Sequence, residues 1–203
     1  MMPAARESLL DAAYTALARL PWSAVRMVDV AAAAGVSRQT LYNEFGSKDG
    51  LARALVRREA DGYLAGIERA LAAYADARER LTATAEWTAS AARGNALVRA
   101  MLTGCWSAGL PTPTLRAVPS SSPVPAQRRA DGPLPSPGDF VAIVRDRAVA
   151  ALSGPGADRQ DIVELARSCE LAVRVGLSCV SAPPGEGEVG ELVRVAFPRP
   201  SAV

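Results

Sequence analysis

The segment from Arg38 to Asn43 carries hydrogen-bonding side chains of the kinds that recognise the edges of DNA bases. A glutamine or asparagine amide matches the N6 and N7 atoms of adenine in pairs, and an arginine guanidinium does the same for O6 and N7 of guanine. We therefore expect Arg38, Gln39 and Asn43 to contact bases. Thr40 and Tyr42 add hydroxyl groups, which suit the phosphate oxygens of the backbone.

These side chains share one face if residues 38–45 form a helix. At 100° per residue, Leu41 and Phe45 lie within about 40° of each other and define a buried side. Gln39 and Asn43 then point the opposite way, and a short helix with such a face fits the major groove of DNA. The alternative, that the polar residues of a short helix are only solvated, accounts for each residue alone but not for the whole spacing.

The flanking residues provide the turns that such a helix needs. Residues 30–48 read VAAAAGVSRQTLYNEFGSK. Gly35 can take the positive φ of a tight turn, and Ser37 is a strong N-cap for the helix that follows. Gly46 ends that helix and Ser47 caps the next one. The pattern predicts a helix-turn-helix.

Lys48 is the one lysine of a chain that has 23 basic residues. It falls at the first position of the helix that Ser47 caps, where a cation faces the positive end of the helix dipole. The helix alone gains nothing from it. Free N–H groups beside an ammonium form a phosphate site, so we expect Lys48 to contact a DNA phosphate.

The remaining sequence predicts an all-α protein. With 203 residues, 49% hydrophobic and 22% charged, the chain can bury a core without crosslinks. Helical periodicity predicts helices at 5–20, 27–34, 38–45, 48–72, 77–92, 95–107, 139–152, 160–180 and 187–196. Residues 119–138 are dense in proline, which predicts a long flexible loop.

Composition also excludes several classes of function. The chain has no histidine, which removes histidine-based catalysis and histidine metal sites. Cys105, Cys169 and Cys179 match neither a zinc motif nor a disulfide framework. We therefore expect no enzyme activity, no metal and no cofactor. No apolar run approaches a membrane span and the N-terminus lacks the features of a signal peptide, so we expect a cytoplasmic protein without membrane contact.

Residues 30–48 resemble the DNA-binding signature of TetR-family transcriptional regulators. The matching pieces are Val30-Ala31, Ala34-Gly35-Val36-Ser37, Thr40-Leu41-Tyr42, Phe45 and Ser47-Lys48. The resemblance implies an N-terminal three-helix helix-turn-helix domain, residues 1–48. A helical domain, residues 49–203, would then dimerise and bind a small effector.

The resemblance also implies roles for single residues. Positions equivalent to Thr40, Tyr42 and Lys48 commonly touch phosphates, and we add Ser37 to this set. Three positions depart from the family pattern. Arg26 stands where a capping Thr is frequent and can instead reach a phosphate or a base; we assign it to a phosphate. Glu44 stands where a hydrogen-bond donor is usual, and Gly50 replaces an acid, so the capping box of that helix is missing.

The C-terminal half carries weaker signals. Candidate walls of an apolar effector pocket are Tyr74, Trp87, Met101, Cys105 and Trp106. Candidate dimer-interface residues follow helical spacing and include small side chains; they are Phe140, Ile143, Val144, Ile162, Leu165, Cys169, Val173, Gly176 and Leu177. For both sets, ordinary core packing within one chain is the alternative.

These observations favour a dimeric transcriptional repressor that binds double-stranded DNA. A small and largely apolar effector would release it from a palindromic operator. The alternative is an effector-independent regulator or an activator, whose C-terminal domain only dimerises or binds another protein.

Overall fold

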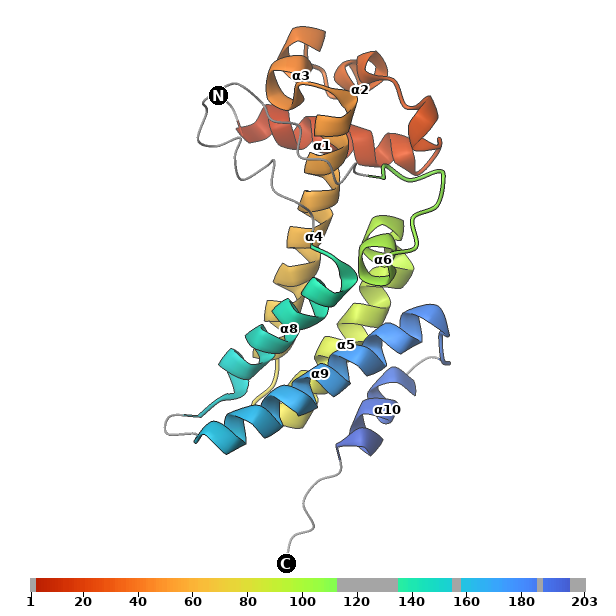
Figure 1. The fold of residues 1–203 in the computed structure, drawn as a ribbon. Coiled ribbons are helices and arrows are strands. Elements are labelled where there is room, and N and C mark those ends of the chain that lie inside the picture. The colour runs from red at the N-terminus through yellow and green to blue at the C-terminus, as the bar shows by residue number, and fades with distance from the viewer. Residues whose placement is uncertain (1–2, 113–134, 155–157, 186–187, 198–203) are drawn as a thin grey trace, which may run out of the picture. The chain divides into compact units, whose positions relative to one another are not determined.

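A computed structural model describes residues 3–112, 135–154, 158–185 and 188–197. Every regular element within these ranges is helical (Figure 1). The elements are α1 (Pro3–Leu17), η1 (Trp22–Ala24), α2 (Met27–Ala33), α3 (Arg38–Phe45), α4 (Lys48–Ala72), α5 (Ala77–Gly94), α6 (Ala96–Thr103), α8 (Pro137–Leu152), α9 (Arg159–Ser181) and α10 (Glu188–Ala196). None of the described helices combines the length and the apolar character needed to cross a bilayer.

The described residues form two compact units. The first contains residues 3–60 and 106–112, and the second contains residues 61–105 together with the described residues from 135 onward. The helix α4 contributes residues to both. The predicted domain boundary after Lys48 differs from this division, because the first turns of α4 bury Leu51 and Leu55 completely.

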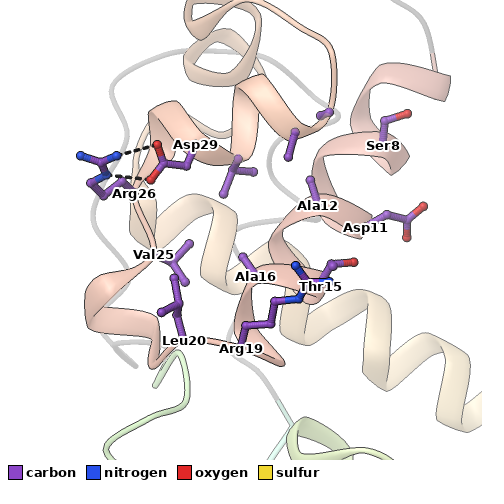
Figure 2. A pocket seen from close by; sticks show the side chains of 13 residues that line it. Ser8, Asp11, Ala12, Thr15, Ala16, Arg19, Leu20, Val25, Arg26 and Asp29 are labelled. Carbon is purple, nitrogen blue, oxygen red and sulfur yellow. Dashed lines mark hydrogen bonds and ion pairs between the residues drawn. The ribbon is translucent and has the colours of Figure 1, made fainter.

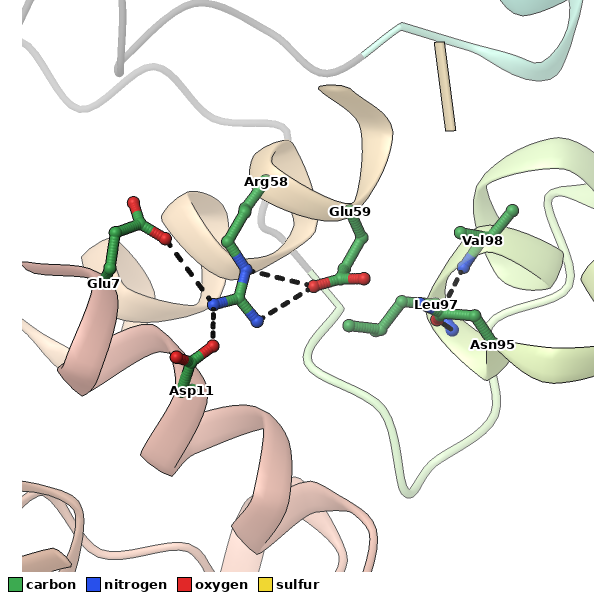
Figure 3. A network of polar contacts seen from close by, with 7 residues as sticks. All are labelled: Glu7, Asp11, Arg58, Glu59, Asn95, Leu97 and Val98. Carbon is green, nitrogen blue, oxygen red and sulfur yellow. Dashed lines mark hydrogen bonds and ion pairs between the residues drawn. The ribbon is translucent and has the colours of Figure 1, made fainter. Parts of the chain in front are cut away.

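The core of the first unit is built by α1, α2, α3 and the start of α4. Leu9, Val30 and Leu41 have almost no exposed surface. At its edge, the Arg58 guanidinium of α4 lies 2.6 Å from Asp11 and 3.8 Å from Glu7 of α1 (Figure 3). The same guanidinium contacts Glu59 at 3.1 Å. This partly buried cluster of opposite charges joins α1 to α4.

The second unit is organised around α5, which packs against α6, α9 and α10, while α8 packs against α9. Small residues set the closest approach. A Cβ atom on Gly176 of α9 would lie 3.1 Å from both the Cα and the carbonyl oxygen of Ala85 on α5. Ala85 and Ala89 are fully buried, so α5 and α9 approach almost backbone to backbone.

Trp87 of α5 lies directly over Gly66 of α4, within the second unit. A Cβ atom on Gly66 would overlap the indole ring, and the Trp87 N–H donates a hydrogen bond to the Tyr63 carbonyl at 3.0 Å. Nearby, the Thr88 hydroxyl donates to the Thr84 carbonyl at 2.9 Å, so the Tyr63 hydroxyl donates to Thr88 at 3.1 Å. Burial raises the pKa of Tyr63 to about 12, which keeps this donor protonated.

Most expected helices are confirmed, with boundaries that differ from the predictions by up to four residues; the helix predicted at 5–20, for example, ends at Leu17. The helix predicted at 95–107 ends at Thr103, because Gly104 adopts the left-handed conformation (φ 75°) and closes it. The helix predicted to begin at 139 begins at Pro137, since Ser136 and Asp139 form a reciprocal capping box. Residues 119–134 of the predicted loop lie outside the described residues.

Two glycines of α4 give a matched test of the packing against Trp87. Gly66→Ala must displace the indole and is expected to lower the free energy of unfolding by about 1–3 kcal/mol. Gly62 is exposed, and a Cβ atom added there would meet no atom within 4 Å, so Gly62→Ala is expected to raise it by up to about 1 kcal/mol. Urea unfolding of both variants measures the difference, and equal effects would contradict the contact.

Candidate nucleic-acid interface

The buried side of α3 is the one that the sequence predicts. Leu41 is fully buried and Phe45 is 9% exposed, and both hold α3 in the first unit, where it packs against α1 and α2. Arg38, Gln39 and Asn43 are consequently exposed. Burying two apolar side chains therefore turns the hydrogen-bonding face of α3 to solvent.

The N-terminus of α3 is capped as expected. The Ser37 hydroxyl accepts a hydrogen bond from the Thr40 backbone N–H at 3.0 Å, and the two hydroxyl oxygens lie 2.9 Å apart. Ser37 and Thr40 thus use part of their hydrogen-bonding capacity within the protein. The neighbouring turns also behave as predicted, with positive φ at Gly35 (68°) and Gly46 (70°).

The two amide side chains of α3 are paired with each other. The Gln39 Nε2 atom donates to Asn43 Oδ1 at 2.8 Å, one helical turn away. This bond leaves the Gln39 amide oxygen and the Asn43 amide N–H groups for other partners. Alongside them, the Arg38 guanidinium lies 6.0 Å from the centre of the Tyr42 ring, and the ring is 40% exposed.

Lys48 begins α4, as predicted, but it has internal partners that the sequence did not indicate. Its Nζ atom donates to the Ser23 carbonyl oxygen at 3.1 Å and lies 5.5 Å from the centre of the Trp22 ring. Contacts within the protein therefore stabilise the ammonium even without an external anion. Lys48 remains partly exposed.

Glu44 is turned away from the exposed face of α3. Its side chain is 6% exposed and lies 3.7 Å from the Arg6 guanidinium of α1. The same guanidinium lies 4.8 Å from the centre of the Phe45 ring. The departure from the family pattern at this position is thus balanced by an arginine, and it adds an ionic contact between α1 and α3.

Gly50 has a steric reason for being a glycine. A Cβ atom at this position would overlap the carbonyl oxygen of Phe45, across the α3–α4 turn. The Gly50 N–H donates to the Ser47 hydroxyl at 3.1 Å, so Ser47 caps α4 as predicted. The acid expected from the family pattern does not fit here, because the two helices approach too closely.

Arg26 precedes α2 and makes no side-chain cap. Its guanidinium instead donates to both carboxylate oxygens of Asp29, at 2.7 and 2.8 Å. These hydrogen bonds lower the pKa of Asp29. Both side chains are exposed, so an approaching phosphate would compete with Asp29 for the Arg26 guanidinium.

A groove of about 570 Å³ lies between α1 and α2 in the first unit (Figure 2). Its apolar lining combines four alanines with Leu20, Val25 and Val30, and its charged lining residues are Asp11, Arg19 and the Arg26–Asp29 pair. Of the expected DNA-contacting residues, Arg26 alone lines this groove. It is therefore a feature separate from the exposed face of α3.

The five candidate effector-pocket residues differ in burial and in their partners. Met101 is buried and Trp87 packs over Gly66 with its N–H already bonded. Tyr74 is 51% exposed. Cys105 is exposed and follows the end of α6, and Trp106 belongs to the first unit.

The candidate dimer residues divide by burial. One group lies in the core of the single chain and leaves no surface for a partner: Phe140, Val144, Cys169, Val173 and Gly176. The other is partly or well exposed: Ile143, Ile162, Leu165 and Leu177. For the first group, the small-residue spacing reflects packing within the chain, as Gly176 against Ala85 illustrates.

The exposed part of α9 borders a groove with α8. This groove has a volume of about 430 Å³, and Val149, Ile162, Val163 and Ala166 line it. At its edge, Arg145 of α8 lies 3.6 Å from Glu170 of α9. Ile162 and Val163 are 40% and 38% exposed, which makes this an apolar surface on the second unit.

Comparisons with known proteins match parts of the chain. Residues 9–55 match the family model of the bacterial regulatory proteins of the tetR family. Over 66 residues the chain is 48% identical to the HTH-type transcriptional regulator AlkX of Mycobacterium tuberculosis, which covers 32% of this chain and 31% of that protein. Over 81 residues it is 37% identical to the HTH-type transcriptional activator FasR of Mycolicibacterium smegmatis, with 40% and 37% covered.

The matched segments thus span about a third of the length of these two relatives. The fold is also similar to that in the crystal structure of a TetR-family transcriptional regulator from Rhodococcus sp. The TM-score is 0.50 at 18% identity, with 96% of this chain and 97% of that chain covered. The likeness at this identity concerns the fold. Among the described residues no cluster of histidine, cysteine or acidic side chains has the arrangement to hold a metal ion.

The contact between Arg6 and Glu44 predicts a stability effect. Arg6→Ala leaves a nearly buried carboxylate without its charge partner and is expected to lower the free energy of unfolding by about 1–3 kcal/mol. Adding Glu44→Gln should recover most of this loss. Arg19→Ala is the control and should change stability by less than about 0.5 kcal/mol. Urea unfolding measures all four proteins; a double variant as unstable as Arg6→Ala would refute the pairing.

Proposed function

Since this chain belongs to the TetR family of bacterial regulatory proteins, as its residues 9–55 show, we propose that it is a DNA-binding transcriptional regulator. The observation that carries the proposal is that α3 exposes Arg38, Gln39 and Asn43 while its opposite side is buried. Such a face suits the major groove, because it offers donors and acceptors with little net charge.

In this proposal Arg38, Gln39 and Asn43 read base edges. The hydrogen bond between Gln39 and Asn43 holds the two amides as one unit, so the bases that they read are coupled. Each amide can pair with N6 and N7 of an adenine if the hydrogen bond between Gln39 and Asn43 is broken or shared with the base. Arg38 selects guanine by the same geometric rule.

Phosphate contacts hold α3 in register. We assign them to Lys48, Tyr42, Thr40, Ser37 and Arg26, all in or beside the helix-turn-helix. Tyr42 and Arg26 are exposed, and Lys48 is partly so. Ser37 and Thr40 also serve the N-cap, and Arg26 must leave or share Asp29. Such contacts carry affinity and orientation rather than sequence information.

Specific binding calls for two copies of the helix, because one eight-residue helix reaches too few bases. We propose a homodimer formed through the exposed residues of α8 and α9, chiefly Ile162 and Val163 beside Val149. A two-fold symmetric dimer would bind a palindromic operator.

The proposed mode of action is repression, relieved by a small and largely apolar effector bound to the second unit. The family resemblance supports this part. Release requires the effector to bind better to a conformer whose two reading helices are wrongly spaced for successive grooves. Of the candidate residues for the effector pocket, Met101 is buried in the second unit.

Base reading by α3 predicts a loss of discrimination rather than of general affinity. Gln39→Ala or Asn43→Ala is expected to lose about 1–3 kcal/mol between an operator selected from random DNA and its variants at particular bases. Because the two amides are hydrogen-bonded, the double variant should lose less than the sum. Fluorescence anisotropy on matched duplexes measures this.

Ser90→Ala, a neutral change at an exposed position of α5, is the control and should bind both duplexes as the unaltered protein does. Equal losses on the operator and on random duplexes would show that Gln39 and Asn43 do not read bases.

The proposed interface predicts an effect on oligomeric state. Ile162→Asp places a carboxylate in an apolar dimer contact and is expected to shift the protein toward monomer in sedimentation velocity, weakening operator binding with it. Leu192→Asp on α10 is the control, because Leu192 is similarly exposed (48%) but lies outside the α8–α9 surface. Dissociation by Leu192→Asp and not by Ile162→Asp would move the interface to α10.

A further inference from the structure

We infer that Trp22 is a positioning residue that holds the Lys48 ammonium ready for a DNA phosphate. The inference rests on the proposed function, since it concerns how one phosphate contact is prepared. It goes beyond that proposal because Trp22 is 8% exposed and is not among the residues assigned a contact with DNA.

The ammonium of Lys48 is held by two groups of the same short turn. Its Nζ atom donates to the Ser23 carbonyl oxygen at 3.1 Å, and the centre of the Trp22 ring is 5.5 Å away. Both residues belong to η1, which is more than twenty positions earlier in the chain. A lysine has a long and flexible stem, so two fixed contacts restrict where its charge can lie.

The turn η1 is itself firmly tied. The Ala24 N–H donates to the Pro21 carbonyl at 2.9 Å and the Val25 N–H to the Trp22 carbonyl at 3.1 Å. The backbone N–H of Trp22 donates to the Gly109 carbonyl at 2.8 Å, within the same compact unit. The backbone of Trp22 is therefore fixed by hydrogen bonds, and burial restricts the ring that faces Lys48.

An aromatic face is suited to this task for a chemical reason. It attracts a cation through its quadrupole and uses none of the three N–H donors of the ammonium. With one donor on the Ser23 carbonyl, two remain for phosphate oxygens. A carboxylate in the place of the ring would neutralise the charge and compete with the phosphate. Among the described residues, Lys48 forms no ion pair with a carboxylate.

A double-variant salt titration separates positioning from a general structural role. Lys48→Ala is expected to reduce the slope of log affinity against log salt by about one unit, the value for one phosphate contact. Trp22→Leu should weaken binding by roughly 3- to 10-fold and lower the same slope, and Trp22→Phe should weaken it less. In the Lys48→Ala background, Trp22→Leu should have no further effect on DNA affinity.

A second measurement covers the case in which Trp22→Leu does not fold. Biosynthetic replacement of tryptophan by ring-fluorinated analogues keeps the shape of the ring and weakens its attraction for cations. Affinity should fall as fluorine is added, and this dependence should vanish in Lys48→Ala. The other tryptophans, Trp87 and Trp106, are present in both proteins and are therefore controlled.

The outcomes are distinct. Equal effects of Trp22→Leu or of fluorination with and without Lys48 would overturn the positioning role while leaving DNA binding through α3 intact. An unchanged salt slope in Lys48→Ala would refute the phosphate contact and the inference together. The base discrimination of Gln39 and Asn43 tests the proposed function separately from either result.

Discussion

The burial of Leu41 and Phe45 is the constraint on which the proposed interface depends. Both side chains are on one side of an eight-residue helix and both are in the core of the first unit. Their burial fixes the rotation of α3 about its own axis, and a rotation of half a turn would hide the amides of Gln39 and Asn43. The flanking glycines and the Ser37 cap fix the ends of the helix, but the apolar pair decides which face is presented.

Local sequence was sufficient to predict this part of the molecule. Helical spacing, the Ser37 and Ser47 caps and the turn glycines act over a few residues, so their effects can be read from the chain directly. The contacts that refine the site join distant residues, such as Arg6 with Glu44 and Lys48 with Ser23. No local sequence pattern predicts these contacts, because they depend on how α1, η1 and α4 pack together.

The second unit shows a different limit. The stripe of small and apolar residues on α9 predicts burial, and Cys169, Val173 and Gly176 are indeed buried. Periodicity does not say what covers a stripe, and here the cover is α5 of the same chain. The same limit applies to Trp87, which packs over Gly66 and donates a hydrogen bond to a backbone carbonyl. The glycine inside α4 was the available signal, since a helix-interior glycine often marks a close contact.

The balance of charge explains why one ammonium can matter. The chain carries 23 basic and 21 acidic residues, so no strong overall field draws it to DNA. In the first unit, Arg6, Arg26 and Arg58 each form an ion pair with a carboxylate. These pairs reduce the attraction of the three guanidinium groups for phosphates of DNA. Lys48 faces a carbonyl and an aromatic ring instead. Its charge is held in place without being neutralised, which leaves it available to a phosphate in the proposed complex with DNA.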